Sequence, residues 1–284
     1  MEHHPNTRRA LCAAAALLVA GLWSGPARAD RASAHYHKGL AHKRAGKLGL
    51  AAAELRKAVQ LRDDYAAAHR SLGVVYRKLG KYPPAIRHLE RAARLQPRSA
   101  RVLYSLGLAL YRGGRKKDAI TTLERAARLA PRDDQINNQL GVLLIRRDPG
   151  RALPYLKAAL GVKPRNVDYI HMLGLCYRRL NKLKLAREHM LRAEALGKRS
   201  AGLQFDLGVL FRRSEQPLRA IKHYEKAIAL EPGMANAYWD LAHVYVQVKR
   251  NDDAVRCYEK YIRLRGDSRD ASIARERIEQ LRGK

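Results

Sequence analysis

The 284-residue chain carries 57 lysines and arginines against 26 acidic residues, which gives a formal net charge of +31. This excess predicts attraction to anionic partners and a strong dependence of binding on salt, but it does not identify the partner. Three cysteines are too few for a disulfide framework, so a disulfide-stapled fold is excluded and stability must come from the apolar core.

Residues 1–29 have the pattern of a secretory signal peptide. Two arginines precede an apolar run, and a small-x-small cleavage site ends at Ala29. The alternative is a membrane anchor, but an apolar run of about 14 residues is shorter than the roughly 20 that span a bilayer. We therefore expect export with cleavage before Asp30, to the periplasm or to the outside of the cell. Contact with a membrane is expected only through an uncleaved signal.

Residues 30–266 repeat with a period of about 34 residues, and each period reads as two amphipathic helices. One small-residue column is complete: Ala51, Ala85, Ala119, Ala152, Ala186, Ala220 and Ala254. A second column runs Ala58, Ala92, Ala126, Ala159, Ala193 and Ala227, and Tyr261 replaces its last member. A glycine column runs Gly39, Gly73, Gly107, Gly141, Gly174 and Gly208, and Ala242 closes it. Small residues alternating with large ones predict helix pairs that nest closely.

This pattern resembles the tetratricopeptide repeat family over seven tandem units. The resemblance implies an all-α, right-handed α-solenoid of helix-turn-helix repeats, in which the first helix of each pair lines an inner groove. The family usually has an aromatic residue before the Leu-Gly pair, whereas this chain has residues such as His35, His69 and Gln204 there. Residues 267–284 place an apolar stripe after Ser268 and are predicted to form a C-terminal capping helix.

Residues opposite the Leu-Gly stripe are predicted to face the groove of such a solenoid. They are Tyr36, Arg70, Tyr104, Asn138, His171, Phe205 and Trp239. Basic residues recur further along the same helices: Lys43, Arg44, Arg77, Lys78, Arg112, Arg146, Arg178, Arg179, Arg212 and Arg213. Arginines interleaved with aromatic rings suit an extended acidic segment of a partner protein.

The basic column has a second interpretation. Its members lie in the last turn of each first helix, where a cation interacts favourably with the helix dipole by roughly 0.3–1 kcal/mol. The column could therefore stabilise the helices without binding a ligand. We favour a binding role for the adjacent pairs Arg178-Arg179 and Arg212-Arg213.

No catalytic or metal-binding signature occurs in the sequence, so we expect no enzyme activity, no cofactor, no metal site and no small-molecule substrate. The clamp with which some family members hold a peptide's terminal carboxylate is also missing, because Tyr36, Leu40 and Ser71 occupy its positions. The sequence predicts a protein-interaction scaffold or adaptor of the cell envelope that binds acidic or extended segments. The alternative is a binder of an anionic polymer, such as an acidic polysaccharide, lipid head groups or nucleic acid, because the second helices are also basic.

Overall fold

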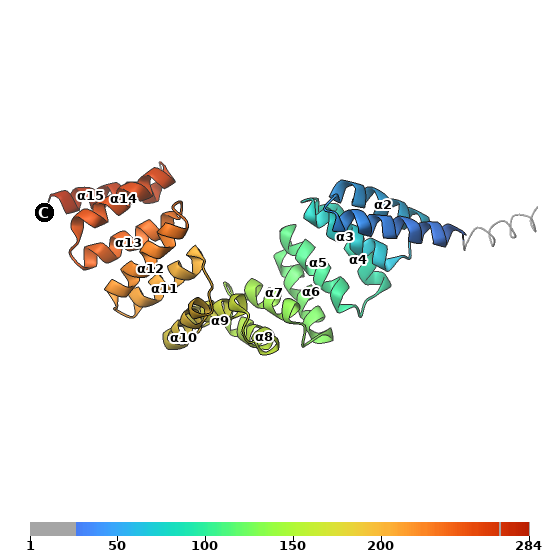
Figure 1. The fold of residues 1–284 in the computed structure, drawn as a ribbon, viewed down its shortest axis with the longest axis horizontal. Coiled ribbons are helices and arrows are strands. Elements are labelled where there is room, and N and C mark those ends of the chain that lie inside the picture. The colour runs from blue at the N-terminus through green and yellow to red at the C-terminus, as the bar shows by residue number, and fades with distance from the viewer. Residues whose placement is uncertain (1–26, 267, 284) are drawn as a thin grey trace, which may run out of the picture. The chain divides into compact units, whose positions relative to one another are not determined.

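The computed structural model describes residues 27–266 and 268–283, and within these residues the chain is all α-helical (Figure 1). A helix over residues 27–44 comes first. It is followed by α2 (Leu48–Leu61), α3 (Ala66–Lys78), α4 (Tyr82–Leu95), α5 (Ala100–Arg112), α6 (Lys116–Leu129), α7 (Asp134–Leu144), α8 (Pro149–Val162), α9 (Val167–Arg179), α10 (Leu183–Ala195), α11 (Ala201–Arg213), α12 (Pro217–Leu230), α13 (Ala235–Gln247), α14 (Asn251–Arg265) and α15 (Arg269–Arg282).

The helices form antiparallel pairs in two compact units, Met1–Pro131 and Arg132–Lys284, here called unit 1 and unit 2. In unit 1 the helix over residues 27–44 pairs with α2, α3 pairs with α4, and α5 pairs with α6. In unit 2 the pairs are α7 with α8, α9 with α10, α11 with α12, and α13 with α14. The predicted helix pairs and the all-α repeat fold are therefore confirmed.

The repeating glycine is the point of closest approach within a pair. A Cβ atom at Gly73 would lie 2.5 Å from Leu89 Cγ and 2.9 Å from the carbonyl oxygen of Ala85, so the two helices could not keep this distance with any other residue. The two alanine columns serve the same packing on the second helices. Every alanine of both columns has an exposed fraction of 0%.

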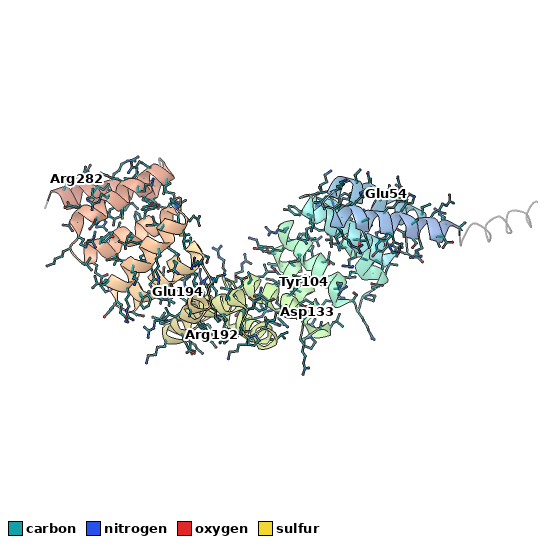
Figure 2. The ribbon with its side chains drawn as sticks, in the orientation of Figure 1. Glu54, Tyr104, Asp133, Arg192, Glu194 and Arg282 are labelled. Atoms are coloured by element: carbon teal, nitrogen blue, oxygen red, sulfur yellow. The ribbon has the colours of Figure 1, made fainter. Side chains whose placement is uncertain are left out.

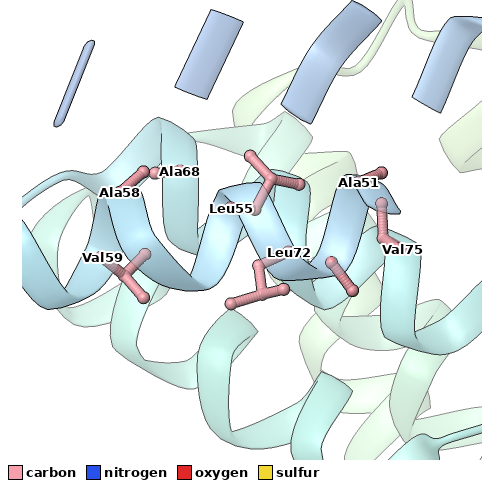
Figure 3. Packing of buried hydrophobic residues seen from close by; sticks show 8 residues of the cluster. Ala51, Leu55, Ala58, Val59, Ala68, Leu72 and Val75 are labelled. Carbon is pink, nitrogen blue, oxygen red and sulfur yellow. The ribbon is translucent and has the colours of Figure 1, made fainter. Parts of the chain in front are cut away.

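The apolar core forms where one pair meets the next. Figure 3 shows an example in unit 1, where side chains of α2 and α3 interdigitate: Ala51, Ala52, Leu55, Ala58, Val59, Ala68, Leu72 and Val75. Full burial of a leucine contributes roughly 1.5–3 kcal/mol, so each repeat depends on its neighbour for much of its stability.

In every described pair except α7 with α8, the turn inside the pair places one residue in the left-handed region of backbone space. In unit 1 the residue is glycine, at Gly46 (φ 72°), Gly80 (φ 73°) and Gly114 (φ 86°). In unit 2 the corresponding turns use Asn181 (φ 59°), Glu215 (φ 55°) and Lys249 (φ 60°). Only glycine adopts this conformation without a steric cost, so the sequence signal for these turns is clear in unit 1 and weak in unit 2.

The last helix, α15, covers the apolar side of α14. Ser268 caps it by accepting a hydrogen bond from the backbone N–H of Ala271, and its stripe of Ala271, Ala274 and Ile278 is buried. At the other end, the predicted signal segment lies outside the described residues except for residues 27–29, which belong to the first described helix. Among the helices that can be described, none is long and apolar enough to cross a membrane.

Candidate functional site

The predicted groove residues all lie on the first helices of their pairs, and we call the side that bears them the first-helix face of each unit. All of them are partly exposed except one, His171 on α9, which is 6% exposed. Figure 2 shows Tyr104 of this series on α5. A partly exposed ring or guanidinium can contact a ligand without unfolding the array, whereas His171 cannot.

In unit 2, His171 and Arg178 are both bound to one buried carboxylate, that of Asp206 on α11. His171 Nε2 lies 3.0 Å from Asp206 Oδ2, and Arg178 Nη2 donates to Asp206 Oδ1 at 3.0 Å. Asp206 carries no signal in the sequence pattern along its own helix. Because this carboxylate neutralises Arg178 from within the protein, Arg178 is a weaker candidate for an external anion than its sequence pattern indicates.

A second carboxylate, that of Asp240 on α13, lies within electrostatic range of Arg212. The hydroxyl of Tyr224 donates to Asp240 Oδ2 at 3.4 Å. Burial raises the pKa of Asp240, although the Arg212 guanidinium opposes this effect. Burial lowers the pKa of Arg212, but Tyr224 and Asp240 outweigh it and leave the pKa raised. Asp240 was also missed from sequence.

The two remaining arginines of the favoured pairs differ from each other. Arg213 donates to Asn181 Oδ1 at 2.7 Å and so ties α11 to the turn after α9. Arg179 is exposed and makes no hydrogen bond or ion pair with another described residue. Arg179 is therefore open to a ligand, whereas Arg178 is bound to Asp206 and Arg213 is bound to Asn181.

Unit 2 also has a hollow of about 360 Å³ on its first-helix face, next to α14 and α15. Its apolar walls are Phe205, Trp239 and Tyr261, and the Trp239 and Tyr261 ring centroids are 4.9 Å apart. Tyr261 replaces the last alanine of the second alanine column. This larger side chain forms one wall of the hollow. Its polar groups are Asn236, Asp240, Arg265 and Asp270.

The first-helix face of unit 1 is cationic. Lys43, Arg70 and Arg77 are partly exposed there, and Arg112 on α5 is exposed. Burial lowers the pKa of Lys43, and the nearby charges of Arg70, Lys78 and Arg77 lower it further. No described carboxylate forms an ion pair with any of these groups. In unit 2, Arg146 is exposed after α7, and Asn138 on α7 keeps a buried Oδ1 without a hydrogen-bond partner.

Polar pairs between the two helices of a repeat occupy the site where the family usually has an aromatic residue. His35 Nδ1 lies 2.7 Å from Glu54 Oε2, and Gln204 Oε1 lies 2.8 Å from His223 Nδ1. A third pair joins His69 and His88. No group of three possible metal ligands occurs among the residues described, and the two cysteines there, Cys176 and Cys257, are free and buried.

Comparison with known families gives consistent matches along the chain. Three family models, each described as tetratricopeptide repeat, match residues 70–134 and 142–201, residues 211–278, and residues 32–65. Together these matches cover most of the chain. No curated protein sequence matches it.

Three solved structures illustrate the similarity in fold. PilF of Pseudomonas aeruginosa is 21% identical, with a TM-score of 0.65 over 78% of this chain and 99% of that one. YrrB, described as a TPR protein with an unusual peptide-binding site, is 21% identical, with a TM-score of 0.57 over 64% and 95%. MamA of Desulfovibrio magneticus RS-1 is 25% identical, with a TM-score of 0.55 over 60% and 96%.

Proposed function

Because this chain belongs to the tetratricopeptide repeat family, a family of protein-interaction scaffolds, we propose that it is an exported scaffold that binds extended, acidic segments of partner proteins on its first-helix faces. The proposal assigns no enzyme activity to the chain. It places the protein in the cell envelope, with the periplasm as the expected compartment.

The hollow of unit 2 is the observation that carries the proposal. Phe205, Trp239 and Tyr261 form apolar walls, and Asn236 and Arg265 place an amide and a guanidinium at the same hollow. Asp240 and Asp270 add two carboxylates, so the hollow suits an apolar part of the segment and not its acidic residues. Arg265 Nη2 donates to Asn236 Oδ1 at 3.1 Å, so the two polar groups hold each other in place. An aromatic or aliphatic side chain of a partner fits the rings, and its peptide groups can hydrogen-bond to the polar rim.

The N-terminal sequence supports the exported location. Residues 1–29 combine a basic start, an apolar run and a small-x-small site. The two cysteines after this segment are buried and unpaired, so the fold does not depend on a disulfide in either redox environment.

Photo-crosslinking in the native host tests the proposal. A photoreactive phenylalanine at Trp239 should yield a discrete crosslinked protein, identified by mass spectrometry. The matched control is the same replacement at Leu218, which lies on second helix α12 and is 73% exposed. The same crosslinks at both positions, or none at Trp239 while Leu218 reacts, would place the partner surface elsewhere.

A further inference from the structure

The first-helix face of unit 1 carries four cations that the described residues do not neutralise: Lys43, Arg70, Arg77 and Lys78, here called the cationic cluster. Arg70 and Arg77 lie two turns apart on α3, and Lys43 lies within electrostatic range of both and of Lys78. None of the four makes a hydrogen bond or an ion pair with another residue of the described ranges. The Nε atom of Arg77 is buried and also lacks a hydrogen-bond partner.

Arg178 of unit 2 occupies the same position in its repeat as Lys43 and Arg77 do in theirs, and it has a carboxylate partner that they lack. Arg178 is bound by Asp206, 28 residues later and on the first helix of the next repeat. The residue at the same spacing from Lys43 is Ser71 and not an aspartate. Ser71 is 1% exposed, and its Oγ has no hydrogen-bond partner. Serine carries no charge, so the internal carboxylate of unit 2 has no counterpart beside Lys43.

Like charges at this range repel one another, and the repulsion is strongest where the groups are partly buried. Burial also lowers the pKa of Arg70, and Arg101 on α5 adds a further repulsive charge. An external anion bound at the cluster would relieve this repulsion and would supply acceptors for donors that now have none.

We propose that the cationic cluster of unit 1 is the site that binds the carboxylates of an acidic peptide segment from a partner protein. This inference rests on the proposed function and assigns the acidic part of the ligand to unit 1, away from the aromatic hollow of unit 2.

The side chains between the cations favour a peptide over a uniformly charged polymer. Val74 lies one turn from both Arg70 and Arg77 on α3 and is partly exposed, and Leu40 lies one turn before Lys43. Tyr36 lies near Arg70 on the neighbouring helix. The face thus alternates cationic with apolar groups, which matches a segment whose glutamates or aspartates alternate with apolar residues.

Fluorescence anisotropy with a labelled peptide of six glutamates and two leucines tests the proposal on the purified protein at fixed salt. The same peptide with glutamine for glutamate is the ligand control. The test variant combines Lys43→Gln, Arg70→Gln, Arg77→Gln and Lys78→Gln. The matched control combines Lys116→Gln, Lys117→Gln, Arg125→Gln and Arg128→Gln, which removes the same charge from exposed positions of α6 in the same unit.

The glutamate peptide should bind more tightly than its glutamine counterpart. The test variant should weaken binding by about tenfold or more, because several charge-assisted hydrogen bonds are lost together. The control should change binding by less than about threefold, since exposed and isolated charges contribute little. Ser71→Asp is an independent second variant. It places a carboxylate at the position that Asp206 has in unit 2, and it should also weaken peptide binding. Circular dichroism confirms the fold of each variant.

Equal losses in the test variant and the α6 control would show attraction by net charge alone and would overturn the proposal. So would a peptide that binds both folded variants as tightly as the unchanged protein, or one that does not bind at all. A single-stranded oligothymidine that binds more tightly than the peptide and depends on the same four residues would reassign the cluster to nucleic acid. None of these outcomes affects the crosslink expected at Trp239, so the proposed function is tested separately.

Discussion

The Nδ1 atoms of His69 and His88 lie 3.1 Å apart, so one of the two rings must accept a hydrogen bond from the other. His69 Nε2 lies 3.0 Å from the carbonyl oxygen of Asp63 and therefore carries the proton that it donates there. This assignment leaves His69 Nδ1 as the acceptor and His88 Nδ1 as the donor. His69 is then neutral, and a proton added to its Nδ1 would place two N–H groups against each other.

We predict that stability falls as the pH falls from about 6.5 to about 4. Burial, together with the charges of His69 and Arg87, lowers the pKa of His88 from its ordinary value of 6.5 to about 4, against a weaker opposite effect of Asp63. Burial also lowers the pKa of His69. Asp63 opposes this effect, and the charge of Arg91 lowers the pKa further. The unfolded chain binds more protons in this window, so acid favours unfolding.

Thermal melts from pH 7.5 to pH 4 measure this effect. The matched variant His69→Leu with His88→Thr installs the neutral pair that the next repeat has at Leu103 and Thr122. It should lose less stability over the same window than the unchanged protein. An equal loss would contradict a role for this pair. Some acid sensitivity should remain in either case, because burial also lowers the pKa values of His189 and His223.

The fold could be predicted from sequence because its closest contacts recur at fixed spacing. The glycine and alanine columns mark where two helices touch, and packing at such points admits few residues. The turns of unit 2 were not predictable in the same way, because Glu215 and Lys249 give no signal for the left-handed backbone that they adopt. Their conformation is imposed by the helices on either side, whose positions are set by tertiary packing.

The glycine column leads to a second prediction, which compares two Gly→Ala replacements in unit 1. Gly73→Ala should destabilise the protein by about 1–3 kcal/mol, because the new Cβ would meet Leu89 and the backbone oxygen of Ala85. Gly49→Ala, in helix α2, should stabilise it by up to about 1 kcal/mol, because a Cβ there meets nothing within 4 Å and alanine favours the helix. Urea titration gives both values. Changes of the same sign in the two variants would contradict the proposed packing.

The candidate site was predicted only in part from sequence. The aromatic and basic positions were predictable because they recur along single helices. Asp206 and Asp240 were not predictable, because their partners lie on the preceding repeat and a pattern read along one helix does not show contacts between repeats. The same limit hid the difference between Arg178 of unit 2, which Asp206 neutralises, and the cationic cluster of unit 1.

The buried carboxylate of unit 2 gives the third prediction. Asp206→Asn should destabilise the protein by about 2–4 kcal/mol, because it leaves the partly buried Arg178 without its counter-charge and changes the partner of His171. Asp168→Asn removes a carboxylate that is 69% exposed and pairs with Lys198, so its cost should stay below about 1 kcal/mol. Urea titration of the two variants measures the difference. If both cost the same, Asp206 does not have the structural role assigned to it.

The last prediction concerns the mature N-terminus, which we expect at Asp30. The first buried residue of the described helix is Ala32, which lies beyond Asp30 and is 0% exposed. Cleavage after Ala29 would remove the long, exposed hydrogen bond from Arg28 Nη2 to the carbonyl oxygen of Gln60, at 3.3 Å. Such a bond contributes at most about 1 kcal/mol, so the shortened chain should keep nearly the full stability of the array.

Intact mass of protein purified from the native host identifies the first residue, and a mass that includes residues 1–29 would overturn the predicted cleavage. Thermal melts then test the structural part of the argument. A chain that starts at Asp30 should melt within a few degrees of the full-length protein, whereas one that starts at Leu40 should melt much lower. The longer truncation removes Ala32, and it also removes His35, whose Nδ1 lies 2.7 Å from Glu54 Oε2 and joins the first helix to α2. Equal melting of the two truncated chains would mean that the first described helix contributes little to unit 1.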